Sequence, residues 1–196
     1  MKPQGKFITL YGINNIGKST QAKRLVARLE AAGHSTLYLK YPIYDLEPSG
    51  PMINEYLRGG NPHNLSPLEI QLLYTLNRTQ YESIIDEKLT SGVWVVAEDY
   101  KGTGWAWGIG TGIPKDIILR INNHLRNPDV EILLDGDPFG TNRETNHKYE
   151  SNDDLLSRVR QIHRELGLEF GWKLVPAAGS IEDVGDAIYG FVQKLF

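Results

Sequence analysis

Five short stretches rich in apolar residues, separated by amphipathic or polar segments, predict the strands of a sheet. They lie at residues 7–11, 34–41, 93–97, 130–134 and 172–175. The run VWVVA at 93–97 is continuously apolar rather than alternating, which is typical of a parallel strand buried on both faces. The pattern favours strands that lie side by side in one parallel sheet.

Apolar residues at helical spacing fill the intervals between these strands. The clearest helix begins after Ser66, because Pro67 occupies the first helical position and Glu69 completes a capping box. This helix is expected to run to about residue 90, with apolar positions at Leu68, Leu72, Leu76, Ile84, Ile85 and Leu89. Other helices are expected from Gly17 to Gly33, over 52–58, 114–126 and 152–170, and after Ser180.

Two segments carry no helical or strand pattern. Residues 102–114, GTGWAWGIGTGIP, are rich in glycine and are expected to connect the third strand to the next helix. Residues 138–151 are polar and are expected to form a mobile lid loop. The alternation of strands and helices predicts a single α/β domain over residues 1–196, with a five-stranded parallel sheet and helices on both faces. In such folds ligands bind at the carboxyl ends of the strands.

Composition narrows the class of protein. The chain has a formal net charge of −3 and no cysteine, which excludes disulfides, thiolate metal sites and a cysteine nucleophile. Acidic and basic residues are interspersed, with no basic stripe, which argues against a nucleic-acid partner. No apolar run approaches the length of a membrane span, and the first strand follows the N-terminus too closely for a signal peptide. A cytoplasmic location is therefore expected.

A phosphate-binding motif joins the first predicted strand to the first predicted helix. The segment GINNIGKS at 12–19 matches G-x-x-x-x-G-K-[ST] at every fixed position, which predicts a P-loop NTPase fold. In this motif backbone N–H groups point at phosphate oxygens, Lys18 neutralises the β- and γ-phosphates, and the Ser19 hydroxyl is a ligand for Mg²⁺. The expected ATP contacts are Gly12, Asn14, Asn15, Ile16, Gly17, Lys18, Ser19 and Thr20.

Two acidic residues at strand ends are candidate partners for Mg²⁺. Glu98 follows the strand at 93–97, and Asp135 follows the strand at 130–134. Either fits the carboxylate that holds Mg²⁺ beside a phosphate loop, and either also suits a residue that caps the next segment. A switch GTPase is disfavoured, because the D-x-x-G match at 137–140 is followed by no N-K-x-D motif. A short chain with an arginine-bearing polar loop late in the sequence suits a small nucleotide kinase.

Several further motifs, taken in order, resemble those of the thymidylate kinase family over nearly the whole chain. They are GKSTQAKRL at 17–25, YP at 41–42, LLYTLNR at 72–78, EDY at 98–100, GWAW at 104–107, NPD at 127–129, HKYE at 147–150, RVR at 158–160 and WKLV at 172–175. Most of these are weak signals singly, but their order and spacing together identify the family.

The resemblance implies phosphoryl transfer from ATP·Mg²⁺ to a deoxynucleoside monophosphate, normally dTMP to dTDP, by a homodimeric enzyme. It implies that Lys18, Glu98 and Arg143 are catalytic and that Lys148 joins Arg143 as a lid cation over the ATP phosphates. The implied metal-binding residues are Ser19, Glu98 and Asp99.

For the acceptor, the implied contacts are Pro42, Tyr74, Arg78, Asp99, Trp107 and Tyr149. Tyr74 would stack on the pyrimidine, and Arg78 would bond its edge from one helical turn along the same face. Trp107 and Tyr149 would flank the sugar. From periodicity alone, a core aromatic is the better interpretation of Tyr74. Trp107 equally suits a packed tryptophan, and Tyr149 and the lid cations equally suit a solvated surface loop.

The sequence departs from the family at three positions. Asn14 stands in the phosphate loop where the family usually has an acidic residue, and Tyr44 and Asp99 stand where it has arginines that hold the acceptor phosphate. Because that phosphate would lie beside Glu98 and Asp99, a compensating charge is needed. Lys101 or a bridging Mg²⁺ would supply it; otherwise the acceptor is a nucleoside. A modified pyrimidine monophosphate as acceptor, and a nucleotide-binding module without transfer, are the remaining alternatives.

Overall fold

The computed structural model describes residues 4–139 and 153–196, and the five predicted strands form one sheet. The strands are β1 (Phe7–Tyr11), β2 (Thr36–Lys40), β3 (Trp94–Glu98), β4 (Val130–Asp135) and β5 (Lys173–Pro176), in the spatial order β2-β3-β1-β4-β5. All neighbouring strands are parallel. The predicted parallel sheet is therefore confirmed.

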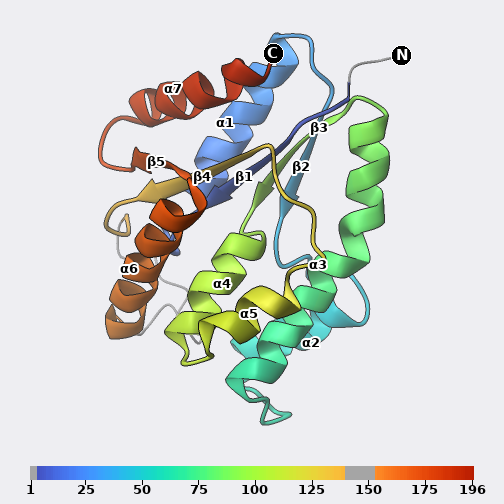
Figure 1. Ribbon diagram of the computed structural model, residues 1–196, viewed down its shortest axis with the longest axis vertical. Helices are drawn as coiled ribbons and strands as arrows, with labels where there is room; N and C mark the ends of the chain where they lie inside the picture. Colours follow the sequence, from blue (N-terminus) through green and yellow to red (C-terminus); the bar gives the residue numbers. More distant parts are fainter. Residues whose placement is uncertain (1–3, 140–152) are drawn as a thin grey trace.

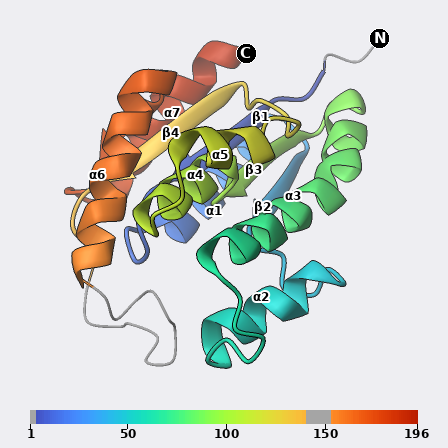
Figure 2. The same cartoon turned by 60° about the horizontal axis from the view of Figure 1, so that its bottom comes forward.

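Helices cover both faces of this sheet (Figure 1). On one face lie α1 (Lys18–Ala31), α7 (Ile181–Val192) and the 3-10 helix η1 (Gln193–Leu195); on the other lie α3 (Pro67–Thr90), α4 (Lys101–Gly110) and α6 (Asp153–Phe170). The helix α5 (Lys115–Ile121) packs on α3 and α4, and α2 (Ser49–Arg58) packs on α3 (Figure 2). In the described ranges no helix is long and apolar enough to cross a membrane.

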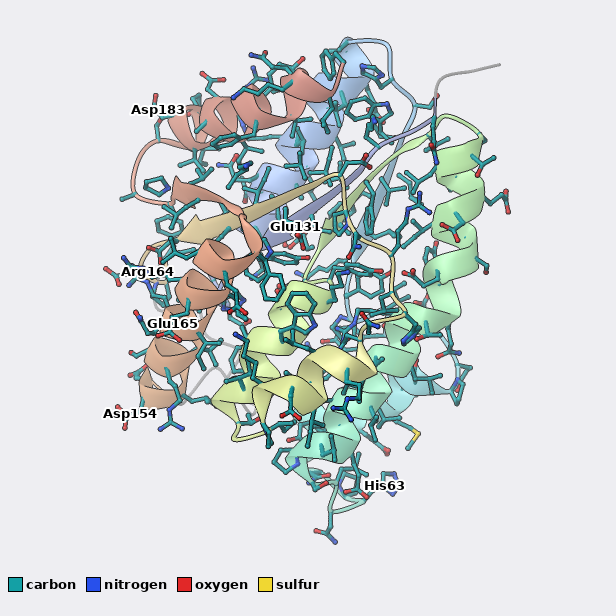
Figure 3. The ribbon with its side chains drawn as sticks, in the orientation of Figure 1. His63, Glu131, Asp154, Arg164, Glu165 and Asp183 are labelled. Atoms are coloured by element: carbon teal, nitrogen blue, oxygen red, sulfur yellow. The ribbon has the colours of Figure 1, made fainter. Side chains whose placement is uncertain are left out.

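The core is a continuous cluster of apolar side chains between the sheet and the two helical layers. Every residue of β1 and β3 is buried, as the apolar run at 93–97 predicts. Charged side chains such as Asp154 and Glu165 lie on the outer surface of α6, whereas Glu131 of β4 is partly buried (Figure 3). The Tyr11 hydroxyl donates to the Glu131 carboxylate at 2.9 Å, so this partly buried charge has a partner.

The glycine-rich segment is not the connector that the sequence predicts, because residues 101–110 form α4. Glycine has low helix propensity, but here it lets the helix approach its neighbours closely. A Cβ atom at Gly102 would lie 2.6 Å from Tyr11 Cε2 and 2.7 Å from Trp172 Cζ2, and one at Gly108 would lie 2.6 Å from Ile118 Cδ1. Tertiary packing thus overrides the local preference of the segment.

Two predicted helix boundaries are also wrong. The helix expected over 114–126 ends at Ile121, where the Asn122 side chain donates to the Ile118 carbonyl oxygen at 2.9 Å and the chain turns. The helix expected from residue 52 begins at Ser49. The predicted starts at Ser66 and Ser180 are confirmed, because both hydroxyls accept a hydrogen bond from a backbone N–H of the first turn.

The expected apolar positions of α3 are buried in its second half, at Ile85 and Leu89, but lie on the outer face in its first half. Leu68, Leu72 and Leu76 are 38%, 46% and 39% exposed. The first half of the buried face carries polar residues instead, among them Gln71, Thr75, Asn77 and Arg78. An inner face of this kind lines a polar cavity rather than a hydrophobic core.

We predict that Gly102→Ala destabilises the fold by about 1–3 kcal/mol, because the added methyl group meets two aromatic rings in a packed interior. Gly190→Ala is the matched control, since a Cβ atom there meets nothing within 4 Å. The control should stabilise α7 by roughly 0.5–1 kcal/mol. Urea unfolding of both variants measures the difference, and equal effects would contradict the close packing of α4.

Candidate active site

The phosphate loop lies between the end of β1 and the start of α1. Its backbone takes left-handed conformations at Gly12, Asn15 and Gly17, with φ of 139°, 60° and 89°. A Cβ atom at Gly12 would lie 2.6 Å from the Leu134 carbonyl oxygen of β4, so only glycine fits there. The loop then delivers the N-terminus of α1, with its partial positive charge, to the carboxyl ends of the strands.

Lys18 folds back over this loop. Its Nζ donates to the carbonyl oxygens of Gly12 at 2.9 Å and Ile13 at 2.8 Å, and lies 3.4 Å from the Asp99 carboxylate. The side chain is only 6% exposed. Lys18 is thus held in one position by three oxygen atoms, with its charge at the floor of a cavity.

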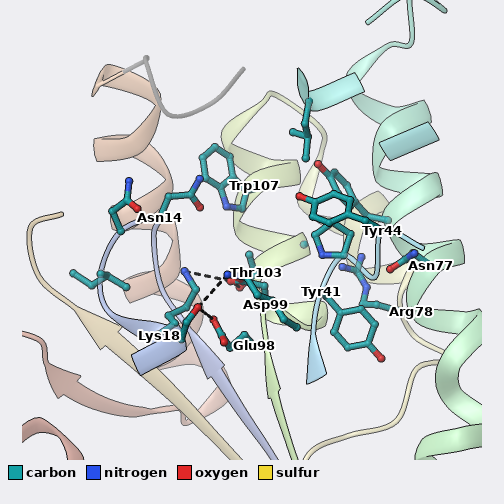
Figure 4. Close-up of a pocket in the computed structure, with 18 of the residues that line it drawn as sticks. Asn14, Lys18, Tyr41, Tyr44, Asn77, Arg78, Glu98, Asp99, Thr103 and Trp107 are labelled. Atoms are coloured by element: carbon teal, nitrogen blue, oxygen red, sulfur yellow. Dashed lines mark hydrogen bonds and ion pairs between the residues drawn. The ribbon is translucent and has the colours of Figure 1, made fainter. Parts of the chain in front are cut away.

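That cavity has a volume of about 570 Å³ and brings together most of the predicted site residues. Its walls include Asn14, Asn15, Ile16, Gly17, Lys18, Ser19, Thr20, Pro42, Tyr74, Arg78, Glu98, Asp99 and Trp107. Lys18, Glu98 and Asp99 are grouped at one end and Tyr44, Asn77 and Arg78 at the other (Figure 4). Arg143, Lys148 and Tyr149 lie outside the described residues.

Glu98, rather than Asp135, lies against the phosphate loop. The Ser19 hydroxyl donates to Glu98 Oε2 at 2.8 Å, and the Tyr38 hydroxyl donates to Glu98 Oε1. Burial and the bond to Glu98 raise the pKa of Tyr38, which keeps its phenol a donor. Asp135 instead accepts from Arg160 Nε at 2.8 Å. Of the two acidic candidates, only Glu98 therefore faces Ser19.

Asp99 lies beside Lys18, whereas Lys101 lies beside Asn127. Asp99 has a left-handed φ of 60°, which directs its carboxylate toward Lys18 and the Thr103 hydroxyl, a donor at 3.2 Å. Burial raises the pKa of Asp99, against the effect of Lys18. Lys101 donates to Asn127 and to the Leu125 carbonyl oxygen at 3.3 Å. The hypothesis that Lys101 reaches back to the acceptor phosphate is therefore wrong.

The far end of the cavity is built from α3 and α4. Arg78 is only 3% exposed and donates to Asn122 Oδ1 at 3.1 Å. Burial lowers the pKa of its guanidinium group. A Cβ atom at Gly104 would lie 2.7 Å from Arg78 Nη2, so the glycine of α4 leaves room for this arginine. Tyr74 and Trp107 add aromatic surface to the same walls.

The sequence of this chain matches a known family of enzymes. The thymidylate kinase family model matches residues 10–188. The chain belongs to the thymidylate kinase family. It is 30% identical to the thymidylate kinase of Arabidopsis thaliana over 187 residues, covering 94% of this chain and 69% of the relative. The human enzyme is 30% identical over 190 residues, with 94% and 88% covered.

The fold agrees with this assignment. The structure of thymidylate kinase from Candida albicans superposes with a TM-score of 0.85 at 23% identity, covering 99% of this chain and 93% of that one. The predicted P-loop NTPase fold, a five-stranded parallel sheet with helices on both faces, is thereby confirmed.

Two cationic residues of the cavity wall, Lys40 and Arg58, escape the sequence motifs of this thymidylate kinase family member. Lys40 Nζ donates to Ser19 Oγ at 3.0 Å, and the Arg58 guanidinium lies 4.8 Å from the centre of the Tyr44 ring. Tyr38 holds Glu98 as described above. The only sequence signal for Lys40 is its place at the end of a strand. Arg58 and Tyr44 are brought together by the packing of α2, which no local pattern predicts.

Asn77 explains why the motif LLYTLNR contains asparagine before arginine. Its side chain accepts from the Ile43 N–H at 2.8 Å and donates to the Ile43 carbonyl oxygen at 2.9 Å. The two bonds fix the loop that follows β2, which carries Pro42 and Tyr44 into the cavity wall. Asn77 is therefore a structural residue of the acceptor side.

Proposed function

We propose that this protein transfers the γ-phosphoryl group of ATP to dTMP, giving ADP and dTDP. The observation that carries the proposal is one cavity with two chemically distinct ends. The phosphate loop, Lys18 and Glu98 form one end, and the aromatic and arginine side chains of α3 and α4 form the other. Membership of the thymidylate kinase family supports the same reaction.

The donor end suits ATP with Mg²⁺. Ser19 Oγ and the Glu98 carboxylate lie within 2.8 Å of each other at the mouth of the loop, and both are hard oxygen donors of the kind that Mg²⁺ prefers. The described residues contain no cluster of three acidic, histidine or cysteine side chains, so the phosphates would complete the coordination. Bound Mg²⁺ would neutralise phosphate charge. Asp99 remains a candidate third oxygen donor.

The acceptor end suits a pyrimidine nucleotide. Tyr74 offers a ring to stack on the base, and Arg78 offers donors for its edge. Pro42 and Trp107 line the same cavity. A nucleoside or a modified pyrimidine monophosphate would use the same walls, and these are the alternatives that the experiment below separates. Tyr149, Arg143 and Lys148 are proposed to join the site from the lid.

Transfer needs positioning and charge neutralisation rather than covalent catalysis. An oxygen of the acceptor phosphate would attack the γ-phosphorus, and the bond from that phosphorus to the β–γ bridging oxygen would break. Lys18 is fixed beside the phosphate loop, where it would offset the charge on the transferring group. The intact Lys18, Ser19 and Glu98 favour an enzyme over a nucleotide-binding module without transfer.

The test is ADP formation from ATP·Mg²⁺ with a panel of acceptors. The panel contains dTMP, thymidine, and the other pyrimidine nucleosides with their monophosphates. Highest turnover with dTMP is expected. Faster phosphorylation of thymidine than of dTMP would show that the acceptor is a nucleoside. Absence of ADP with every acceptor would support the non-catalytic module.

We predict that Lys18→Met lowers turnover by about a hundredfold or more, because a positioned charge is worth roughly 3 kcal/mol or more in such a transition state. Methionine keeps the aliphatic stem and removes the charge. Lys23→Met is the matched control, since Lys23 is exposed on α1. Steady-state turnover of both folded variants gives the comparison. Retention of more than about a tenth of wild-type turnover would remove Lys18 from the catalytic group.

We further propose that the protein is a homodimer that associates through α3. Leu68, Leu72 and Leu76 form an apolar stripe on the outer face of this helix, where the spacing i, i+4, i+8 places them in one row. A row of large apolar side chains of this kind is typical of a helix that packs on another helix. We call these three residues the α3 stripe.

Leu72→Glu should weaken the dimer by roughly thirtyfold or more, because it places a charge at the centre of the contact. Leu168→Glu is the control, since Leu168 is 86% exposed on α6. Light scattering after size exclusion, over a range of protein concentrations, measures the dissociation of each variant. A monomeric wild type, or a Leu72→Glu dimer of unchanged strength, would refute the proposal.

A further inference from the structure

The two ends of the cavity meet beside a pair of carboxylates. Glu98 and Asp99 end β3, and the phosphate of a nucleotide acceptor has to approach the donor phosphates next to them. Lys18 belongs to the donor side, because its Nζ is fixed at the phosphate loop by two carbonyl oxygens and offsets the charge of Asp99, so it does not also balance an acceptor phosphate. An acceptor phosphate in this position therefore needs a second cation.

Four cationic side chains of the described residues line the cavity: Lys18, Lys40, Arg58 and Arg78. Arg78 is buried at the far end and bonded to Asn122. Arg58 lies over the Tyr44 ring on the wall that α2 provides. Lys40 is the one next to the phosphate loop, since its Nζ lies 3.0 Å from Ser19 Oγ.

The end of β2 fixes where Lys40 points. Lys40 pairs with Glu98 in the parallel register of β2 and β3. Alternate residues of a strand share a face, so Lys40 lies on the same side as Tyr38, which holds the Glu98 carboxylate. Unlike Lys18, Lys40 is exposed to solvent, so its flexible stem is able to follow a ligand.

We propose that Lys40 binds the phosphate of the acceptor beside Glu98. This inference rests on the proposed function and names the group that recognises a nucleoside monophosphate over a nucleoside. In the transfer, one acceptor phosphate oxygen forms a bond to the γ-phosphorus, and the bridging oxygen leaves with ADP and keeps the electron pair. Lys40 supplies positive charge to the acceptor phosphate, which offsets the repulsion from Glu98 and Asp99.

The experiment compares binding of dTMP, thymidine and ATP by calorimetry to the wild type, Lys40→Met, Lys40→Arg and Lys23→Met. The ratio of thymidine to dTMP dissociation constants isolates the phosphate. Lys40→Met should lower this ratio roughly ten- to hundredfold, as the loss of a charged hydrogen bond does. Lys40→Arg should keep most of it. Lys23→Met should change it by less than about twofold, as a surface substitution does.

Three results would overturn the inference. An unchanged ratio in Lys40→Met would show that the phosphate does not contact Lys40. Equal weakening of dTMP and thymidine would place Lys40 in general packing, and selective weakening of ATP would assign it to the donor. Failure of the proposed function is distinguishable, because in that case the wild type itself would neither prefer dTMP to thymidine nor phosphorylate dTMP.

Discussion

The ion pair between Lys18 and Asp99 fixes the phosphate-loop end of the cavity. Lys18 begins α1, and Asp99 follows β3, so a contact of 3.4 Å ties the phosphate loop to the neighbouring strand end. Both partners are largely buried, and removal of one partner from such a pair typically costs about 3–5 kcal/mol. Phosphates bound in the loop would compete with Asp99 for the same ammonium group.

The sequence predicts this arrangement well wherever the chemistry is local. The phosphate loop requires glycine at two backbone positions, followed by a lysine and a hydroxyl in fixed order. These requirements produce a motif that can be recognised in the sequence. Buried parallel strands are equally visible, because both of their faces are apolar. The position of Glu98 at the carboxyl end of a buried strand predicts that it lies at the cavity. The choice between Glu98 and Asp135 needed the structure, since both follow a buried strand and only Glu98 faces Ser19.

The wrong predictions for α3 and α4 have a common physical origin, which is packing between segments that are distant in the sequence. Gly102 and Gly108 weaken a helix locally, yet they are what allows α4 to lie against Tyr11, Trp172 and Ile118. Leu68, Leu72 and Leu76 lie on the outer face of α3, and the first half of its inner face carries polar residues such as Gln71 and Thr75. In both helices the local sequence pattern predicts the wrong structure for the part that lines the cavity. Deviations of this kind are expected where function competes with a hydrophobic core.

The charges of the cavity differ from those that the family resemblance implies. Asn14 stands where the resemblance implies an acid, and Asp99, which follows β3, pairs with Lys18. Tyr44 and Asp99 stand where the resemblance implies arginines. The cations that remain near the acceptor path come from other elements: Lys40 from β2 and Arg58 from α2. Because α2 packs on α3 and β2 pairs with β3, the charges of Lys40 and Arg58 are positioned by contacts between distant elements rather than by a local sequence motif.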